Sequence, residues 1–88
     1  MAGMQKYPYE QVNIDEKKIV NTIGDNIYRL RMKKGLSIRL LALNAGLDER
    51  QLYRIENSEQ KASILSVIKI AKALNIGLDE LIKGEDIE

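Results

Sequence analysis

The sequence contains no cysteine, histidine, tryptophan or phenylalanine. Without cysteine the chain has no disulfide framework and no thiolate nucleophile, which fits a protein of a reducing compartment. Because the sequence contains neither cysteine nor histidine, a transition-metal site is disfavoured and the histidine-based catalytic triads are excluded. The chain also lacks a glycine-rich phosphate-binding loop and a clustered pair of carboxylates. We therefore expect no enzyme, no metal and no cofactor.

Long apolar runs are missing as well. No stretch reaches the roughly 18 apolar residues that would span a membrane, and the first ten residues hold no apolar run of the kind found in a signal peptide. We therefore expect a soluble, intracellular protein without a membrane partner. The 88 residues, of which 44% are hydrophobic, are enough for one small domain with an aliphatic core.

The net charge of +1 indicates no partner by itself, but its distribution is uneven. Residues 29–61 hold eight basic and four acidic side chains, which gives +4. The rest of the chain holds six basic and nine acidic side chains, which gives −3. A basic middle between acidic ends is typical of a domain with one anion-facing side. The alternative is an ordinary solvated helical surface.

Apolar residues recur at helical spacing in the first third of the chain. We expect a helix to begin at residues 13–15, where Asn13 and Glu16 have the spacing of a capping box. Gly24 interrupts the pattern, so the alternative is a helix that starts afresh near Thr22. The apolar stripe and the glycine expected to end the helix are Ile19, Val20, Ile23, Ile27, Leu30 and Gly35.

Residues 37–58 predict two short helices joined by one tight turn. Ser37 is placed to cap the first helix, and Asp48 is placed to cap the second. Between them, Gly46 can end a helix in the left-handed conformation at no steric cost. A glycine-containing turn of about three residues between two short helices is typical of a helix-turn-helix motif. The inward-facing residues of the pair are Leu41, Ala42, Ala45, Leu52 and Ile55.

Two further helices follow. Ser63 is placed to cap a fourth helix and Asn75 to end it, and residues 78–83 predict a short fifth helix. No strand-like alternation is visible, so the fold class is all-α. The apolar face expected for the fourth helix consists of Ile64, Val67, Ile68, Ala71 and Leu74.

The sequence predicts three segments. Residues 1–14 have no helical period and form a flexible N-terminal arm in this interpretation. Residues 15–84 form the folded domain, and residues 85–88 form an acidic tail.

From residue 23 to residue 83 the chain resembles the phage-repressor and Cro-like (XRE-type) helix-turn-helix family of transcriptional regulators. The resemblance rests on the order and spacing of the segments IGDNIYRLRMKKGLS, LALNAGL, LYRIEN, ILSVIKIAKALNI and LDELI. It implies a compact five-helix lambda-repressor-like DNA-binding domain, with helices two and three as the helix-turn-helix. It also implies a sequence-specific DNA-binding regulator, with repression as the expected action, in the cytoplasm and associated with a bacterial or phage nucleoid.

The resemblance makes residues 48–57 the recognition helix, which enters the major groove. The residue chemistry agrees, because Arg50 and Arg54 share one helix face and arginine binds guanine through two hydrogen bonds, while Glu49 can accept from cytosine. The alternative is that these charged residues form a cluster of surface salt bridges. For Tyr53 three roles are open: contact with a base, a hydrogen bond to a phosphate, or packing over the helix surface. The expected base-contacting residues are Glu49, Arg50, Gln51, Tyr53 and Arg54.

Phosphate contacts are expected at helix N-termini and at basic side chains. Unpaired N–H groups and the positive end of the helix dipole favour an anion at the start of a helix, and such contacts position the protein without reading sequence. The expected phosphate-contacting residues are Ser37, Ile38, Arg39, Asp48, Ser58, Gln60 and Lys61.

The resemblance also implies one structural ion pair. In the family a first-helix arginine pairs with the glutamate that ends the recognition helix, and Arg31 and Glu56 occupy these positions. We expect a partly buried pair that fixes the angle of the third helix, so Glu56 is not interpreted as a catalytic acid.

The chain departs from the family pattern at several positions. Ile38 replaces the usual glutamine, Ser58 a glycine and Ala62 a proline, while Leu40 and Leu43 stand where polar residues are usual. Ile38, Leu40 and Leu43 are therefore expected to form an exposed apolar patch, and such patches often mark contact sites. The alternatives are that the N-terminal arm covers the patch and that these are ordinary scattered surface leucines. A contact site at this patch gives the alternative function, a protein-interaction module such as an antitoxin, antagonist or co-regulator.

The expected partners are double-stranded DNA and a second copy of the chain, because two-fold dimers read palindromic sites. Several apolar residues towards the C-terminus can form a dimer interface or complete the core, and we favour the core for Leu78 and Leu81. The full set is Ile76, Leu78, Leu81, Ile82 and Ile87.

Overall fold

The computed structural model describes residues 14–84, and all regular structure in this range is helical. The prediction of an all-α, five-helix domain is confirmed. The helices are α1 (Glu16–Lys33), α2 (Ile38–Ala45), α3 (Glu49–Glu56), α4 (Ile64–Leu74) and α5 (Leu78–Ile82). None of the helices within residues 14–84 combines the length and the apolar character needed to cross a lipid bilayer.

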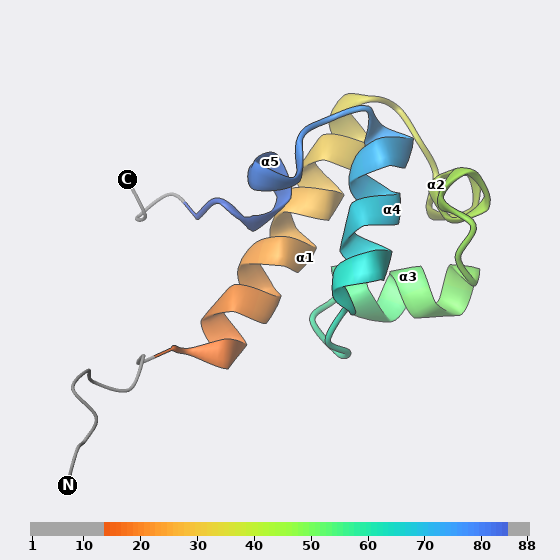
Figure 1. Cartoon of the computed structure of the whole chain (residues 1–88). Helices are drawn as coiled ribbons and strands as arrows, with labels where there is room; N and C mark the ends of the chain where they lie inside the picture. The colour runs from red at the N-terminus through yellow and green to blue at the C-terminus, as the bar shows by residue number, and fades with distance from the viewer. Residues whose placement is uncertain (1–13, 85–88) are drawn as a thin grey trace, which may run out of the picture.

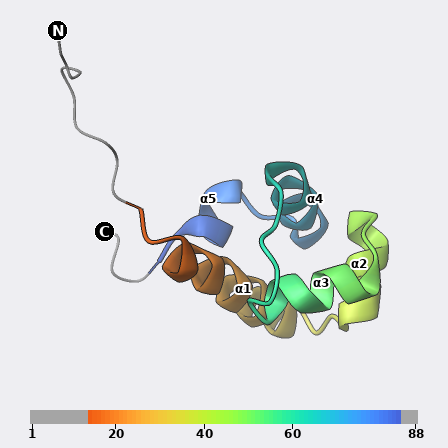
Figure 2. The same cartoon turned by 90° about the horizontal axis from the view of Figure 1, so that it is seen from below.

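The long helix α1 forms one side of the molecule, and the short helix α5 packs against its middle (Figure 1). Helix α3 packs against α1 and runs along one edge of the domain, with α2 next to it (Figures 1 and 2). Helix α4 lies between α5 and α2 and packs against both (Figure 2).

The core is aliphatic, and every helix contributes to it. Its largest fully buried side chains are Ile27, Leu41, Leu52, Ile55, Ile70, Leu74 and Leu81. Each such side chain stabilises the fold by about 1.5–3 kcal/mol relative to an exposed position. The inward positions predicted for the helix-turn-helix pair are confirmed, because Leu41, Ala42, Ala45, Leu52 and Ile55 are all buried.

Helix α1 differs from its prediction in two respects. Its N-cap is Asp15, whose carboxylate accepts from the N–H of Lys18 at 3.1 Å, while Asn13 lies outside the described residues. The helix also continues through Gly24, so the alternative of a new start near Thr22 is wrong. A Cβ on Gly24 would lie 2.7 Å from the carbonyl oxygen of Glu56 and 2.8 Å from that of Ile55. The glycine therefore lets α1 approach the backbone of α3 instead of breaking the helix.

Helices α1 to α4 end with the same hydrogen-bond pattern. A residue in the left-handed conformation follows each helix, and the next N–H donates to a carbonyl five residues earlier. Glycine adopts this conformation freely and asparagine tolerates it, but serine does so at a cost. The predicted endings at Gly35, Gly46 and Asn75 are confirmed, and Ser58, which stands where the family has a glycine, provides a fourth. The four residues and their φ angles are Gly35 at 69°, Gly46 at 69°, Ser58 at 61° and Asn75 at 59°.

Helix α4 turns a different face to the core from the predicted one. Val67, Ala71 and Leu74 are buried as expected, but Ile70 is buried as well and Ile64 is largely exposed. The helix is apolar on nearly all sides, so the periodicity of its sequence does not single out one face. The packing of α2 and α5 against α4 determines which face of α4 is buried.

Helix α5 completes the core instead of extending away from it. Leu81 is fully buried, while Ile76 and Leu78 are half-buried against the same cluster. The buried side chain of Asn26 donates to the carbonyl oxygens of Leu81 at 2.8 Å and Lys83 at 3.0 Å. Of the residues considered for a dimer interface, only Ile82 is exposed within the described range, and Ile87 lies outside it.

Candidate nucleic-acid interface

Helix α3 presents a charged face to solvent. Asp48 caps the helix by accepting from the N–H of Arg50 at 2.8 Å. One turn later, Tyr53 and Arg54 lie on the same exposed side as Glu49 and Arg50. Within residues 14–84 none of Glu49, Arg50 and Arg54 forms an ion pair, so the alternative of a surface salt-bridge cluster is not what the structure contains.

The opposite side of α3 is fixed to the domain. Arg31 forms two hydrogen bonds with the Glu56 carboxylate, from Nε to Oε2 and from Nη2 to Oε1, each at 2.8 Å. A third hydrogen bond runs from Arg31 Nη1 to the carbonyl oxygen of Leu36, also at 2.8 Å. Both side chains of the pair are buried. Such a pair is strongly sensitive to the loss of one partner, because the other charge is then left uncompensated.

The surroundings of Arg31 stabilise its charged form. The hydrogen bond to Glu56 raises the pKa of Arg31 above its already high value, against the opposing effect of burial. The Arg31 Cζ atom also lies 5.5 Å from the centroid of the Tyr28 ring, a cation–π distance. Arg31 is therefore held in its charged form at the contact between α1 and α3.

Predicted base-contacting and phosphate-contacting residues meet at one hollow between α2 and α3. Its volume is about 590 Å³. Gln51 is half-buried at the side of α3, and Arg54 lies one turn beyond the hollow. The lining residues are Ile38, Asp48, Glu49, Arg50 and Tyr53.

The start of α2 offers backbone donors beside this hollow. Ser37 caps the helix, and its Oγ accepts from the N–H of Leu40 at 3.0 Å. The N–H groups of Ile38 and Arg39 lie in the first turn, where an α-helix provides no internal acceptor. The Asp48 carboxylate is engaged as a cap, so a phosphate near Asp48 would be bound by backbone N–H groups of the first turn of α3.

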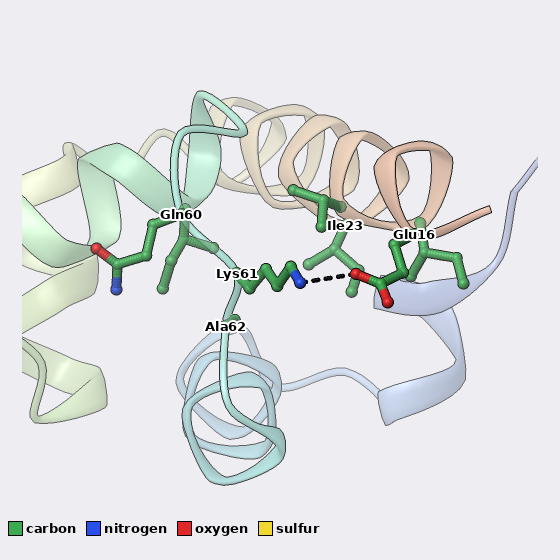
Figure 3. Close-up of a pocket in the computed structure, with 8 residues that line it drawn as sticks. Glu16, Ile23, Gln60, Lys61 and Ala62 are labelled. Carbon is green, nitrogen blue, oxygen red and sulfur yellow. Dashed lines mark hydrogen bonds and ion pairs between the residues drawn. The ribbon is translucent and has the colours of Figure 1, made fainter. Parts of the chain in front are cut away.

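The α3–α4 loop does not line the α2–α3 hollow and instead contacts α1. Lys61 Nζ lies 2.7 Å from Glu16 Oε1, so the side chain reaches back to α1 (Figure 3). This hydrogen bond and the attraction of the charges lower the pKa of Glu16 and raise that of Lys61. Lys61 and Gln60 border a second, mainly apolar hollow of about 340 Å³, whose other lining residues are Glu16, Ile19, Val20, Ile23, Ile55 and Ala62.

Ser58, Gln60 and Lys61 therefore do not line the α2–α3 hollow. To bind a phosphate, Lys61 must release the Glu16 carboxylate. The two residues are 45 positions apart in the sequence, and no sequence pattern predicts their contact. Sequence analysis also missed Asn26 and the close packing at Gly24, whose partners are backbone carbonyl oxygens that no side-chain pattern reveals.

The predicted apolar patch on α2 is smaller than expected. Leu43 is 73% exposed and Leu40 is also exposed, but Ile38 is half-buried and packs against the core. The patch therefore consists of Leu40 and Leu43.

Several known proteins are similar to this chain in sequence and in fold. The sequence profile described as "Helix-turn-helix" matches residues 27–81. An uncharacterised HTH-type transcriptional regulator of Rickettsia prowazekii is 35% identical over 68 residues, which cover 77% of this chain and 52% of the regulator. The chain thus spans about half the length of this relative.

Two solved structures are similar in both sequence and fold. The restriction-modification controller protein C.AhdI from Aeromonas hydrophila is 34% identical, with a TM-score of 0.69 over 70% of this chain and 94% of that chain. The N-terminal DNA-binding domain of SinR from Bacillus subtilis is 30% identical, with a TM-score of 0.70 over 75% of this chain and 97% of that domain. The fold is the expected five-helix lambda-repressor-like domain, and the chain belongs to the Cro/C1-type (XRE) helix-turn-helix family of transcriptional regulators.

Proposed function

We propose that this protein is a sequence-specific DNA-binding regulator that represses transcription by occupying an operator. One observation carries the proposal: α3 is fixed to the domain through buried groups, while its outer face presents charged groups without ion-pair partners within residues 14–84. A helix held in this way can enter the major groove and present side chains to base edges. Its site of action is the cytoplasm, where such a regulator meets DNA.

Base reading falls to the outer face of α3. Arg50 and Arg54 each can bind O6 and N7 of a guanine, and Glu49 can accept from the amino group of a cytosine. Tyr53 lies between the two arginines along the helix and contacts a thymine methyl group or a phosphate. Gln51 is half-buried and takes a peripheral position in this arrangement.

Phosphate anchoring falls to the start of α2 and to the α3–α4 loop. The first turn of α2 borders the α2–α3 hollow through Ile38, and the next residue, Arg39, has an exposed side chain. Both features favour a phosphate at the start of α2. Lys61 contributes only if it exchanges the Glu16 carboxylate for a phosphate. We expect Ser58 and Gln60 to play a smaller part than the start of α2.

The test is selection of bound sequences from a random DNA pool by the purified chain at two salt concentrations. Wild-type protein should enrich a motif, and a palindrome would indicate a dimer with half-sites about 34 Å apart. Arg50→Ala and Arg54→Ala should each lower affinity for the preferred site by about 1–3 kcal/mol. Lys17→Ala, which removes the same charge from α1, is the matched control and should change affinity little.

The result that would overturn the proposal is a lack of any enriched motif, with weak binding that disappears as salt rises. Arg39→Ala separates anchoring from reading. It should weaken binding to all sequences alike and reduce the slope of log affinity against log salt by about one unit.

The exposed leucines of α2 support a second candidate function, a protein-interaction module on the same fold. Leu43 is 73% exposed on a helix whose other face is in the core, and the partner would present a complementary apolar surface. Leu43→Glu should abolish such a complex and leave DNA binding intact. A partner complex that survives this change would eliminate the candidate.

A further inference from the structure

The apolar face of α1 extends beyond the core. In the second half of the helix, Ile27 and Leu30 on this face are buried. In the first half the same face carries Ile19, which is 44% exposed, and Val20 and Ile23, which are half-buried. Residues spaced by three and four positions lie on one side of a helix. The first half of α1 therefore presents an apolar strip that residues 14–84 cover only in part.

This strip is one wall of the hollow of about 340 Å³ between α1 and the α3–α4 loop (Figure 3). Three consecutive loop residues, Gln60, Lys61 and Ala62, also line it, as does the buried Ile55 of α3. We call it the α1–loop hollow. Sites for small molecules have volumes of about 300–1,000 Å³ and are lined mainly by apolar side chains with a few polar groups. The α1–loop hollow therefore has the size and the lining of a site for one small molecule.

An ion pair lies at the edge of the α1–loop hollow. The side chain of Lys61 extends from the loop to Glu16, where Nζ and Oε1 are 2.7 Å apart (Figure 3). The two side chains are 74% and 72% exposed. Such an exposed pair contributes little to stability, because water competes for both charges. The pair can therefore open, and each charge can then bind a ligand group of opposite sign.

The two charges select the class of ligand. The Glu16 carboxylate can accept from an ammonium group, and the Lys61 ammonium group can donate to a carboxylate. A ligand with a single charge would satisfy one of the two side chains and leave the other without its present partner. An α-amino acid satisfies both, because its ammonium and carboxylate groups are attached to the same carbon atom. An aliphatic side chain on that carbon would lie against the apolar strip of α1.

We propose that the α1–loop hollow binds a free α-amino acid with an aliphatic side chain, whose ammonium group pairs with Glu16 and whose carboxylate pairs with Lys61. The ligand also affects DNA binding, because its carboxylate competes with a phosphate for the Lys61 ammonium group. The amino acid therefore lowers the affinity for DNA, and DNA lowers the affinity for the amino acid by the same factor. This effect rests on the proposed function, whereas the binding of the amino acid does not.

The test is titration of the full 88-residue chain with L-leucine, followed by NMR of the methyl groups. Saturable shifts are expected for Ile19, Ile23 and Ala62, which line the hollow, and none for Leu43 and Ile82, which do not. Signals that stay unchanged up to the solubility limit of L-leucine would overturn the proposal. Shifts that follow the protein concentration instead would mean that a second copy covers the hollow, which would also overturn it.

Three analogues test the parts of the ligand without any change to the protein. Glycine has both charges but no side chain, 4-methylpentanoate lacks the ammonium group of leucine, and 3-methylbutylamine lacks its carboxylate. Each should bind at least about tenfold more weakly than L-leucine. Equal binding of 4-methylpentanoate or 3-methylbutylamine would show that one charge is sufficient, and equal binding of glycine would show that the hollow takes no side chain. Each of these results would overturn the amino-acid proposal.

Two matched variants test the place of binding. Ile19→Gln puts a polar group on the wall of the hollow and should weaken L-leucine binding severalfold. Ile82→Gln is the control, because Ile82 is 46% exposed, against 44% for Ile19, and lies on α5 outside the hollow. It should leave L-leucine binding unchanged. Circular dichroism checks that both variants are folded, and a folded Ile19→Gln variant that binds L-leucine as wild type does would overturn the proposal.

DNA binding tests the effect of the ligand separately. On a site selected by wild-type protein, saturating L-leucine should lower the DNA affinity of wild type and Ile82→Gln but not that of Ile19→Gln. An unchanged DNA affinity of wild type would overturn the effect on DNA and leave the ligand site in place. If wild type binds L-leucine but enriches no motif, the amino-acid site stands and the proposed function fails.

Discussion

The two sides of α3 differ in almost every physical respect. On the inner side Leu52 and Ile55 are in the core, and Glu56 is buried with its carboxylate oxygens bonded to Arg31. On the outer side Arg50 and Arg54 are exposed and form no ion pair with the described residues. Stability and the proposed recognition of DNA therefore depend on different residues of one short helix, so substitutions should affect one property and leave the other intact.

The largest effect on stability is expected when the buried ion pair is broken. Glu56→Ala leaves the Arg31 guanidinium buried without its partner, which should lower the free energy of unfolding by about 3–5 kcal/mol. Urea denaturation followed by circular dichroism measures this loss. Arg54→Ala, on the outer side of the same helix, should change the unfolding free energy by less than about 0.5 kcal/mol.

A paired replacement separates the loss of charge from the loss of packing. The double variant Arg31→Met with Glu56→Leu removes both charges and fills a similar volume, so it should recover most of the stability. If the double variant is as unstable as Glu56→Ala, the hydrogen bond from Arg31 to the Leu36 carbonyl matters more than the uncompensated charge.

A smaller effect is expected at the contact between α1 and α3. In Gly24→Ala the new methyl group would meet two carbonyl oxygens within 2.8 Å, so the backbones must separate. Overpacking of this kind costs about 1–3 kcal/mol, although alanine alone would favour the helix. The thermal midpoint should therefore fall. A rise would mean that α1 and α3 separate freely and that the inner side of α3 is less rigid than the contact suggests.

Ser58→Gly should act in the opposite direction. Ser58 holds a φ of 61° immediately after the last turn of α3, where a non-glycine residue is strained by about 1–2 kcal/mol. Glycine removes the strain but gains freedom in the unfolded chain, so the net gain should be about 0.5–1 kcal/mol. Asn75→Gly is the comparison, and it should gain less because asparagine tolerates this conformation. Equal gains at both sites would contradict the assignment of strain to Ser58.

The smallest effect concerns the exposed pair between Glu16 and Lys61. The hydrogen bond from Lys61 lowers the pKa of Glu16 below its usual 4.5, so the unfolded chain takes up the proton first as the pH falls. The contribution to stability is therefore complete above 4.5 and is lost as the pH drops through the lowered pKa. The raised pKa of Lys61 gives the mirror behaviour above 10.5.

The unfolding free energies of wild type and Glu16→Gln, measured at neutral and at acidic pH, check this contribution. The two proteins should differ slightly at neutral pH and converge in acid, and high salt should remove the difference. A difference that persists in acid would point to packing of the Glu16 side chain instead of its charge.

Sequence reasoning predicted the helices well because their ends carry chemical signals. Ser37, Asp48 and Ser63 cap helices as expected, and Gly35, Gly46 and Asn75 end them. These signals act within a few residues of the backbone that they affect, so they can be read locally. The resemblance to the family then identified α3 as the second helix of the helix-turn-helix motif.

The main misses concern contacts across the fold. Gly24 was interpreted as a weak point, because nothing in its neighbourhood shows the carbonyl oxygens of α3. The face of α4 was assigned around Ile64 instead of Ile70, because a helix that is apolar on most sides has no unique inward direction. Nothing in the sequence around Lys61 indicates its contact with Glu16, whose carboxylate lies 2.7 Å away.

The repeated left-handed ending fixes the direction in which the chain leaves each of the first four helices. Two backbone hydrogen bonds close each ending, so one helix has little room to swing against the next. On the proposed function, a duplex bound by such a domain bends or twists to fit α3. Base steps that no side chain touches then influence affinity through their ease of deformation. Sites with identical contacted bases should therefore be ranked by the flexibility of their other base steps.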